Sequence, residues 1–504
     1  MLHGETDLAW LCNDQLETQD RPLTIIRRSS QVCRKWRDII LGSPLLWGKL
    51  LDMSLLSELA RGHWMNEVVR RSGRSPLHIT TDNEGVSRRL SSLVTLLDDH
   101  WERVQVLNVI LKVWVSTDTI RSEISQILRR PTSCLRSFKL DFISDTGYYP
   151  ELGPEPPLFG NAAPALIALR CTHPFLNLGS TNLWLSQLRV LHITLDTRTY
   201  NVPALLEAFK RIPGLEILML GGWQLHTGSP SVPHKSVALP NLKVLRLLTV
   251  TTTTMTEILD ALVLPDVCSL VVFARRELED FVRDNLTHTY QTLHRYSRNY
   301  FNTHTITSLL LSITSNTLLL QDTSMNHGPG VSRFSLDLRS DAEFLGGELS
   351  LFFDLFADAN LAKTTYITLD IGPSHDHLSE SNFMSLLHRL DSVEALDTSE
   401  PTTTLQFLSI DLHRNAQRIY FFSTPTTVPQ MAEDENVLID EIDLRNLDYD
   451  SSPQDLDLLE EMTGLFITWD TSTASDDEEL ICEYLCGSGN PEMLRDIFPI
   501  DNTM

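Results

Sequence analysis

Leucine-rich six-residue segments recur along most of this 504-residue chain, and they constrain its fold more than any other feature. Each fits the template L-x-x-L-x-L, with apolar residues at the first, fourth and sixth positions. Alternate side chains of an extended strand share a face, so the fourth and sixth positions form one apolar face. The clear matches start 22 to 31 residues apart, at Val104, Leu135, Leu166, Leu188, Leu215, Leu242 and Val267.

Weaker matches extend the pattern, and helix-like segments lie between some of the predicted strands. Residues 202–213 and 255–265 carry apolar residues at helical spacing, and each segment ends in proline. Proline cannot continue a helix, and it favours an extended conformation in the residue before it. The sequence therefore predicts a repeating unit of one helix and one strand. The weaker strand matches start at Ile306, Val331, Thr364, Leu405 and Ile439.

Such a unit has one apolar strand face and one apolar helix stripe, and stacking against neighbouring units buries both. We therefore expect an α/β fold in which residues 77–447 form a strand–helix solenoid. The unequal spacing leaves an alternative, an ordinary α/β domain with several leucine-rich strands. Residues 1–76 are expected to form a short helical segment, and residues 448–504 an acidic C-terminal cap or tail.

The residues between the apolar positions of each strand are expected to lie on the opposite face of the sheet. This outward row mixes apolar, polar and basic side chains, as protein-binding surfaces often do. Scattered surface residues without a partner would give the same pattern, so both interpretations stay open. The candidate substrate-binding residues are Lys139, His192, Met219 and Arg246.

The charge of the chain is unevenly distributed. The formal net charge is −25, and residues 432–504 contain 21 acidic and 2 basic side chains. Residues 21–74 have the opposite balance, with 11 basic and 4 acidic side chains. An acidic chain is a poor candidate for nucleic-acid binding, which requires a basic surface.

The cysteine pattern and the hydropathy indicate the compartment. The 7 cysteines are widely spaced, which argues against a disulfide framework and for a reducing compartment. No apolar run approaches the ~18 residues that span a bilayer. The start of the chain lacks the basic and apolar regions of a signal peptide. We therefore expect a cytoplasmic or nuclear protein that does not act at a membrane.

Motifs for catalysis are missing from the sequence. There is no phosphate-binding loop, no G-x-S-x-G nucleophile elbow and no H-E-x-x-H zinc helix. His375-Asp-His377 could contribute to a metal site, but no further ligands lie nearby, and Gly372-Pro373 before it favours a loop. We expect no enzymatic activity, no metal and no cofactor, and we rank an enzyme of unrecognised class well below a binding protein.

The basic N-terminal segment carries a helical pattern. Apolar residues recur at helical spacing over residues 25–40, and basic residues flank them. Gly42 is expected to end this helix, Ser43-Pro44 to begin a new element, and a further helix to run over about 55–71. On composition alone, these residues predict a small helical cap with Trp36 and Trp47 in its core.

Two stretches of this segment resemble the second half of an F-box, namely Gln31-Val-Cys-Arg-Lys-Trp-Arg-Asp-Ile39 and Leu41-Gly-Ser-Pro-Leu-Leu-Trp47. Residues 68–77 are similar to the segment that joins the F-box to the repeats in fungal F-box proteins. The strand template in turn looks like an irregular leucine-rich repeat array. The resemblance implies docking to the Skp-type adaptor, and through it to the cullin, of an SCF ubiquitin ligase. The matching positions, some adaptor contacts and others core, are Val32, Cys33, Trp36, Ile39, Leu46 and Trp47.

The resemblance implies that the chain is a substrate-recognition adaptor that holds an unknown protein substrate on its repeats. Skp-type adaptors are acidic, which suits the basic segment. The sequence departs from the family in residues 1–21, which contain no proline and so lack the Leu-Pro helix start. Either the sequence begins downstream of that start, or adaptor binding is weak or lost. In the second case the chain would be a non-catalytic leucine-rich-repeat scaffold with a relic F-box.

Overall fold

The computed structural model describes most of the first three quarters of the chain and separate strands of the remainder. Every structural statement below concerns the described residues alone. They are residues 22–58, 63–81, 90–112, 118–143, 157–172, 182–194, 202–222, 236–276, 283–324, 334–344, 346–356, 359–371, 386, 392–393, 395–398, 418–421, 441–443, 466–471 and 480–485. The weak strand match at Leu405, the His375-Asp-His377 cluster and the acidic run 476–479 lie outside them.

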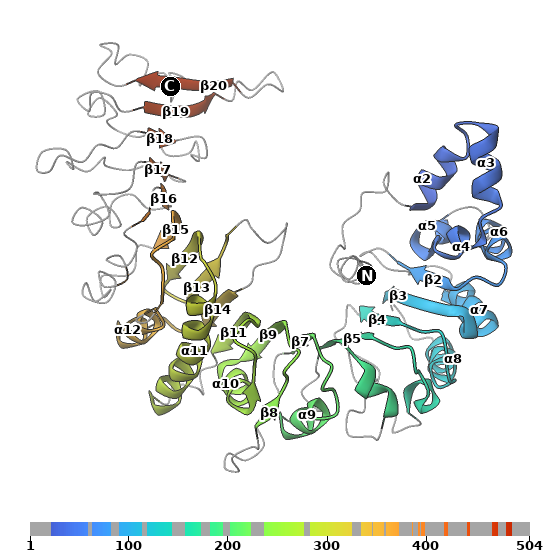
Figure 1. The fold of residues 1–504 in the computed structure, drawn as a ribbon, viewed down its shortest axis with the longest axis horizontal. Coiled ribbons are helices and arrows are strands. Elements are labelled where there is room, and N and C mark those ends of the chain that lie inside the picture. The colour runs from blue at the N-terminus through green and yellow to red at the C-terminus, as the bar shows by residue number, and fades with distance from the viewer. Residues whose placement is uncertain are drawn as a thin grey trace, which may run out of the picture. The chain divides into compact units, whose positions relative to one another are not determined.

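The chain packs as two units. Unit 1 comprises Met1–Leu242 with Ala261–Leu264, and unit 2 comprises Lys243–Asp260 with Pro265–Met504. Each unit is α/β and has a mostly parallel sheet with helices packed on it, as Figure 1 shows. The boundary between the units falls inside residues 77–447, the stretch expected to form one array. The expected boundaries at 76/77 and 447/448 stay predictions.

The main sheet of unit 1 is parallel, and each of its strands pairs with the next one along the chain. The register keeps the fourth template positions in line, because Leu107 pairs with Phe138, Phe138 with Leu169, and so on through Leu191 to Leu218. The strands are β1 (Leu51–Asp52), β2 (Leu77–Thr80), β3 (Val104–Lys112), β4 (Ser137–Ile143), β5 (Ala168–Thr172), β6 (Val190–Thr194) and β7 (Ile217–Gly221). A separate parallel pair joins β8 (Val237–Ala238) to β10 (Leu262–Val263).

Helices cover one face of this sheet (Figure 1). They are α7 (Leu90–His100), α8 (Asp118–Leu128) and α9 (Val202–Phe209), with 3-10 turns η3 (Trp101–Arg103), η4 (Leu158–Asn161) and η5 (Leu183–Gln187). The fourth and sixth template positions point toward these helices and are almost fully buried. The expected helix at 202–213 is thereby confirmed as α9, and Pro213 follows it.

An aromatic cluster fills the core of unit 1. The ring of Phe159 lies 5.3 Å from Phe138, 5.6 Å from Trp184 and 6.3 Å from Trp101, centroid to centroid. Phe159 adopts a left-handed backbone with φ of 58°, followed by Gly160 at 53°. A Cβ on residue 160 would lie 3.1 Å from the Arg129 carbonyl oxygen. Glycine at 160 therefore permits the tight turn that places Phe159 in the core.

Short helices lie before β1 and between β1 and β2 of unit 1, and here one expectation needs correction. The helix expected over 25–40 is broken by a turn, because Cys33 caps a new helix and its Sγ accepts the Trp36 N–H at 3.5 Å. Gly42 and Pro44 act as expected, and the helix expected over 55–71 is two helices. The helices are α2 (Pro22–Ser29), α3 (Arg34–Leu41), α4 (Pro44–Gly48), α5 (Met53–Glu58) and α6 (His63–Ser72).

Unit 2 has the spatial strand order β9, β11, β14, β13, β12, β15, β16, β17, β18, β19, β20. Its helices, α10 (Thr252–Ala261), α11 (Arg283–Thr303) and α12 (Gly346–Asp354), lie on one side of the strands in Figure 1. The strands are β9 (Val244–Thr251), β11 (Ser269–Arg276), β12 (Ser308–Thr314), β13 (Thr317–Asp322), β14 (Phe334–Ser340), β15 (Tyr366–Ile371), β16 (Ala395–Thr398), β17 (Arg418–Phe421), β18 (Glu441–Asp443), β19 (Phe466–Thr471) and β20 (Leu480–Leu485).

The order of unit 2 reverses locally. Strand β12 turns back through residues 315–316 into the antiparallel β13, and β14 then pairs with both β13 and β11. The matches at Ile306 and Val331 both contribute strands, but β13 lies between them in the sheet. The template misses β13 because that strand follows a two-residue hairpin turn instead of a helix and a lead-in. All the other matches within the described ranges also coincide with strands.

Candidate functional site

Helix α3 carries an exposed apolar surface, here called the Trp36 face, which consists of Val32, Trp36 and Ile39. Their exposed fractions are 72%, 55% and 58%. Trp36 and Ile39 are three residues apart and share one side of α3, and Val32 lies just before its N-terminus. Seven of the twelve large exposed apolar side chains in the described ranges fall between residues 25 and 64. Such a concentration is typical of a surface that binds a partner.

Trp47 has a structural role. It is only 5% exposed, and its Nε1–H donates a 2.7 Å hydrogen bond to the Ile40 carbonyl oxygen. The Arg71 guanidinium of α6 lies 4.7 Å from the centre of its ring. Trp47 therefore joins α3, α4 and α6, and the Trp36 face is built without it. Of the other matching positions, Cys33 is exposed and Leu46 is partly buried.

The charge around the Trp36 face is positive. Arg27, Arg28, Arg34, Lys35 and Arg37 are all exposed, and Asp38 is the one acidic residue between positions 22 and 51. The Nε–H of Arg37 donates to the Ser30 carbonyl oxygen at 3.1 Å, which holds the start of α3 against the end of α2. An exposed apolar stripe within a basic surround favours an acidic partner with its own apolar anchor.

The outward face of unit 1 brings three of the four candidate substrate-binding residues into one row. Lys139 pairs with Arg170, Arg170 with His192, and His192 with Met219 across β4 to β7. Leu191 and Ile193 on either side of His192 are fully buried. Arg246 belongs to β9 in unit 2 and is not part of this row.

The expected exposure of this row needs correction. Lys139 is 4% exposed and His192 8%, so neither lies open to solvent. Neighbouring strands are only ~4.8 Å apart, and long side chains in one row therefore cover each other. Sequence reasoning also missed two residues of this face, Arg170 and Asp141. Arg170 lies between Leu169 and Cys171, so the same alternation could have identified it.

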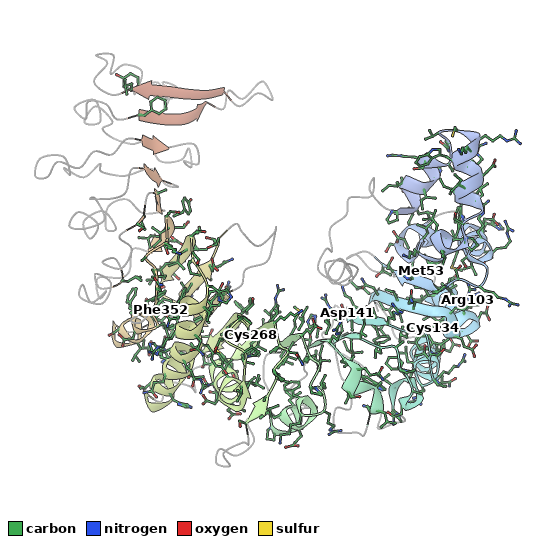
Figure 2. All side chains as sticks on the ribbon, viewed as in Figure 1. Met53, Arg103, Cys134, Asp141, Cys268 and Phe352 are labelled. Atoms are coloured by element: carbon green, nitrogen blue, oxygen red, sulfur yellow. The ribbon has the colours of Figure 1, made fainter. Side chains whose placement is uncertain are left out.

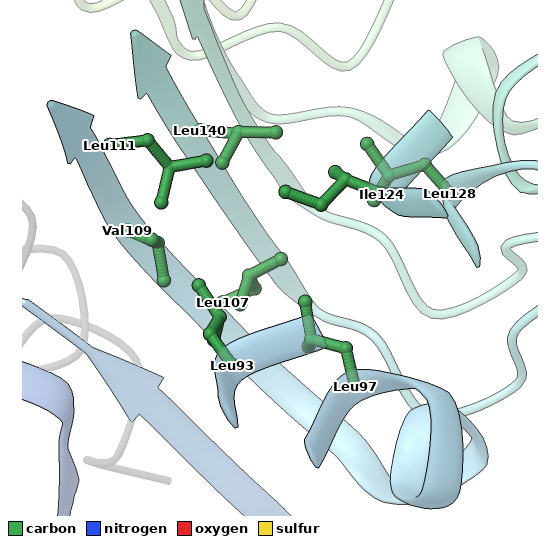
Figure 3. Close-up of a pocket in the computed structure, with 8 residues that line it drawn as sticks. All are labelled: Leu93, Leu97, Leu107, Val109, Leu111, Ile124, Leu128 and Leu140. Carbon is green, nitrogen blue, oxygen red and sulfur yellow. The ribbon is translucent and has the colours of Figure 1, made fainter. Parts of the chain in front are cut away.

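The described ranges contain little that could hold a metal ion or a small molecule. No group of three or more His, Cys, Asp or Glu side chains there could hold a metal ion. One cavity of about 10 Å³ lies between α7, α8, β3 and β4, and aliphatic side chains alone line it (Figure 3). Small-molecule sites are about 300–1,000 Å³ and contain polar groups, so this cavity is a packing gap.

The buried thiol of Cys268 also lacks the features of a reactive group. Burial raises its pKa from 9.0 to about 12, so the thiolate is scarce at neutral pH. Among the described helices, none combines the length and the apolar character needed to cross a bilayer.

No protein-family model matches this chain, and no curated protein matches it. The two surfaces described above, the Trp36 face and the strand row of unit 1, therefore carry the inference of function.

Proposed function

We propose that the chain is a substrate-recognition adaptor of an SCF-type ubiquitin ligase. The observation that carries the proposal is the Trp36 face, where three apolar side chains lie exposed on α3 and just before it, at positions that resemble the F-box motif. A side chain as large as tryptophan, exposed to 55%, gains stabilisation when a partner covers it. The basic surround suits the acidic Skp-type adaptors of the family.

The parallel strands with helices on one face support the second half of the proposal, an irregular leucine-rich-repeat solenoid that holds a protein substrate. In unit 1 each strand pairs with its successor, as stacked repeats do. The helix-free face of these strands is then the substrate side, with Lys139, His192 and Met219 in one row.

In this role the chain itself breaks and forms no bond. It binds the Skp-type adaptor, and through it the cullin, with the Trp36 face, and it binds the substrate with the strands. Holding both on one scaffold raises the effective concentration of a substrate lysine near the ubiquitin donor. The proposal places the protein in the cytoplasm or nucleus, where this machinery works.

The burial of the matching positions supports dividing them between two proposed roles. Val32, Trp36 and Ile39 are proposed as adaptor contacts, with the exposed Cys33 and the partly buried Leu46 at the margin. Trp47 supports the helices from inside. A binding assay can separate these roles, because an exposed contact affects affinity and a buried residue affects stability.

The test measures binding of the full-length chain to a purified Skp-type adaptor by calorimetry. We expect the wild type to bind and Trp36→Ala to lose at least ~2 kcal/mol of binding free energy, as a hot-spot tryptophan does. The matched control is Leu183→Ala on η5 of the strand array, which removes a side chain that is 74% exposed. Its affinity should equal that of the wild type.

Thermal unfolding of each variant checks that the fold is intact. A folded wild-type chain that fails to bind the adaptor contradicts the proposal and leaves the non-catalytic scaffold with a relic F-box as the better hypothesis. Equal losses for Trp36→Ala and Leu183→Ala would also contradict it, because the Trp36 face would then have no special part in binding.

A further inference from the structure

Three charged side chains meet on the helix-free strand face of unit 1, and we call them the charge cluster: Lys139, Asp141 and Arg170. Asp141, labelled in Figure 2, has its Oδ2 3.9 Å from Lys139 Nζ and 3.8 Å from Arg170 Nε. A charge-assisted hydrogen bond is ~2.7–2.9 Å long, so one carboxylate is shared loosely between two cations. The cluster has one more positive charge than negative.

The cluster also contains buried polar atoms without hydrogen bonds. Within the described ranges, neither Asp141 Oδ1 nor Arg170 Nε has a hydrogen-bond partner, although both atoms are shielded from solvent. A buried donor without an acceptor is unfavourable, because it has lost water and gained nothing in return. The Arg170 side chain as a whole is still 29% exposed, so part of it is open to an incoming group.

We propose that the charge cluster binds an acidic segment of a protein substrate. One Asp or Glu carboxylate of that segment accepts hydrogen bonds from the Arg170 guanidinium and lies close to Lys139. Adjacent strands are ~4.8 Å apart, so a single carboxylate spans both cations. Asp141 limits the affinity, because its charge repels the incoming one.

This inference names the substrate class and rests on the proposed function only in treating the helix-free face as the substrate side. Charge complementarity decides the occupant. In the row that crosses β4 to β6, Lys139 is next to Arg170, and Arg170 is next to His192. Asp141 lies on the same face and contributes one negative charge. An acidic peptide complements this arrangement, whereas a basic one would meet two cations.

The test uses the full-length chain and a fluorescein-labelled peptide in which glutamate alternates with glycine. A peptide with glutamine in place of glutamate is the control ligand. Fluorescence anisotropy should show binding of the acidic peptide that weakens as NaCl is added, because salt screens the charges. Arg170→Gln should weaken binding about tenfold, the effect of one charged hydrogen bond. Asp141→Asn should strengthen it several-fold.

Arg189→Gln is the matched control variant. It removes the same charge from unit 1, but Arg189 Nε is already 2.8 Å from Glu216 and lies outside the cluster. Its affinity should stay within twofold of the wild type. The opposite effects of Arg170→Gln and Asp141→Asn cannot both arise from unfolding. Equal losses for Arg170→Gln and Arg189→Gln, or equal binding of the two peptides, would overturn the inference.

The chain also carries its own acidic run at 476–479, which provides a third comparison. If neutralising that run strengthens peptide binding more than Asp141→Asn does, the chain's own segment is the occupant and the inference is overturned. No Skp-type adaptor is present in this assay. A failure of adaptor binding therefore counts against the proposed function alone, and a failure of peptide binding against the charge cluster alone.

Discussion

Two tryptophans show how differently the two ends of unit 1 use apolar residues. Trp36 on α3 is 55% exposed, whereas Trp184 on η5 is 1% exposed and lies edge-on to Phe159. In the strand region, apolar side chains point toward the covering helices. On α3, Trp36 and Ile39 are exposed to solvent, and Ile40 is the buried apolar residue. The contrast separates residues that hold the fold together from residues that are available to a partner.

The difference has a physical cause. The inner strands of unit 1, β2 to β6, have a neighbour on each side, and helices cover one face of the sheet. The fourth and sixth template positions of β3 to β7 are buried under these helices. Helix α3 is eight residues long and buries Ile40 alone. A helix this short has few positions that can face the interior, and the Trp36 face stays exposed to solvent.

The largest expected effect tests this contrast directly. Trp184→Ala removes a ring from the aromatic core and should lower the free energy of unfolding by ~3–5 kcal/mol. Trp36→Ala removes an exposed ring and should change it by no more than ~0.5 kcal/mol. Chemical denaturation of both variants provides the measurement. Similar losses would show that Trp36 is part of the core and would remove the distinction between the two regions.

Disrupting a buried ion pair of unit 2 is expected to lower the free energy of unfolding by a smaller amount. This substitution tests whether charged side chains also stabilise the core. Arg276 of β11 is 2% exposed, and its Nη1–H donates to Glu348 Oε2 of α12 at 2.8 Å. Glu348→Gln removes the carboxylate that accepts this hydrogen bond from the buried arginine and should lose ~3 kcal/mol. Replacing both residues, Arg276→Met with Glu348→Leu, should lose less. A double variant that is less stable than the single one would contradict this account.

The smallest effect concerns the partly exposed ion pairs that Glu67 of α6 forms with Arg70 and Arg71. Hydrogen bonds from Arg70 and Arg71 lower the pKa of Glu67 from 4.5 to about 2. The depressed pKa means that the pair stabilises the fold above pH 4.5 and loses this effect as the pH falls toward 2. Glu67→Gln should flatten the pH dependence of unfolding in that window and have less effect than either core substitution. An unchanged pH profile would show that the pair contributes nothing.

Much of the strand pattern could be predicted from the sequence, because burial on one face imposes a regular spacing of apolar residues. Leu191 and Ile193 show this clearly. The position of β14 beside β11 could not be predicted, because it depends on a hairpin that the spacing does not encode. The burial of Trp47 depends on α6, because the guanidinium of Arg71 lies over its ring. Such packing partners lie too far along the chain for a local pattern to reveal.

The reversal in unit 2 has a consequence for the rate at which this protein folds. In unit 1 a strand finds its partner within a few tens of residues, so the sheet can grow one strand at a time. In unit 2, Leu270 of β11 pairs with Phe334 of β14, 64 residues later. Closing a longer loop before any contact forms slows folding. We therefore expect the strands of unit 2 to pair after those of unit 1. Until β14 arrives, the side of β11 that it pairs with stays open to non-native strand pairing.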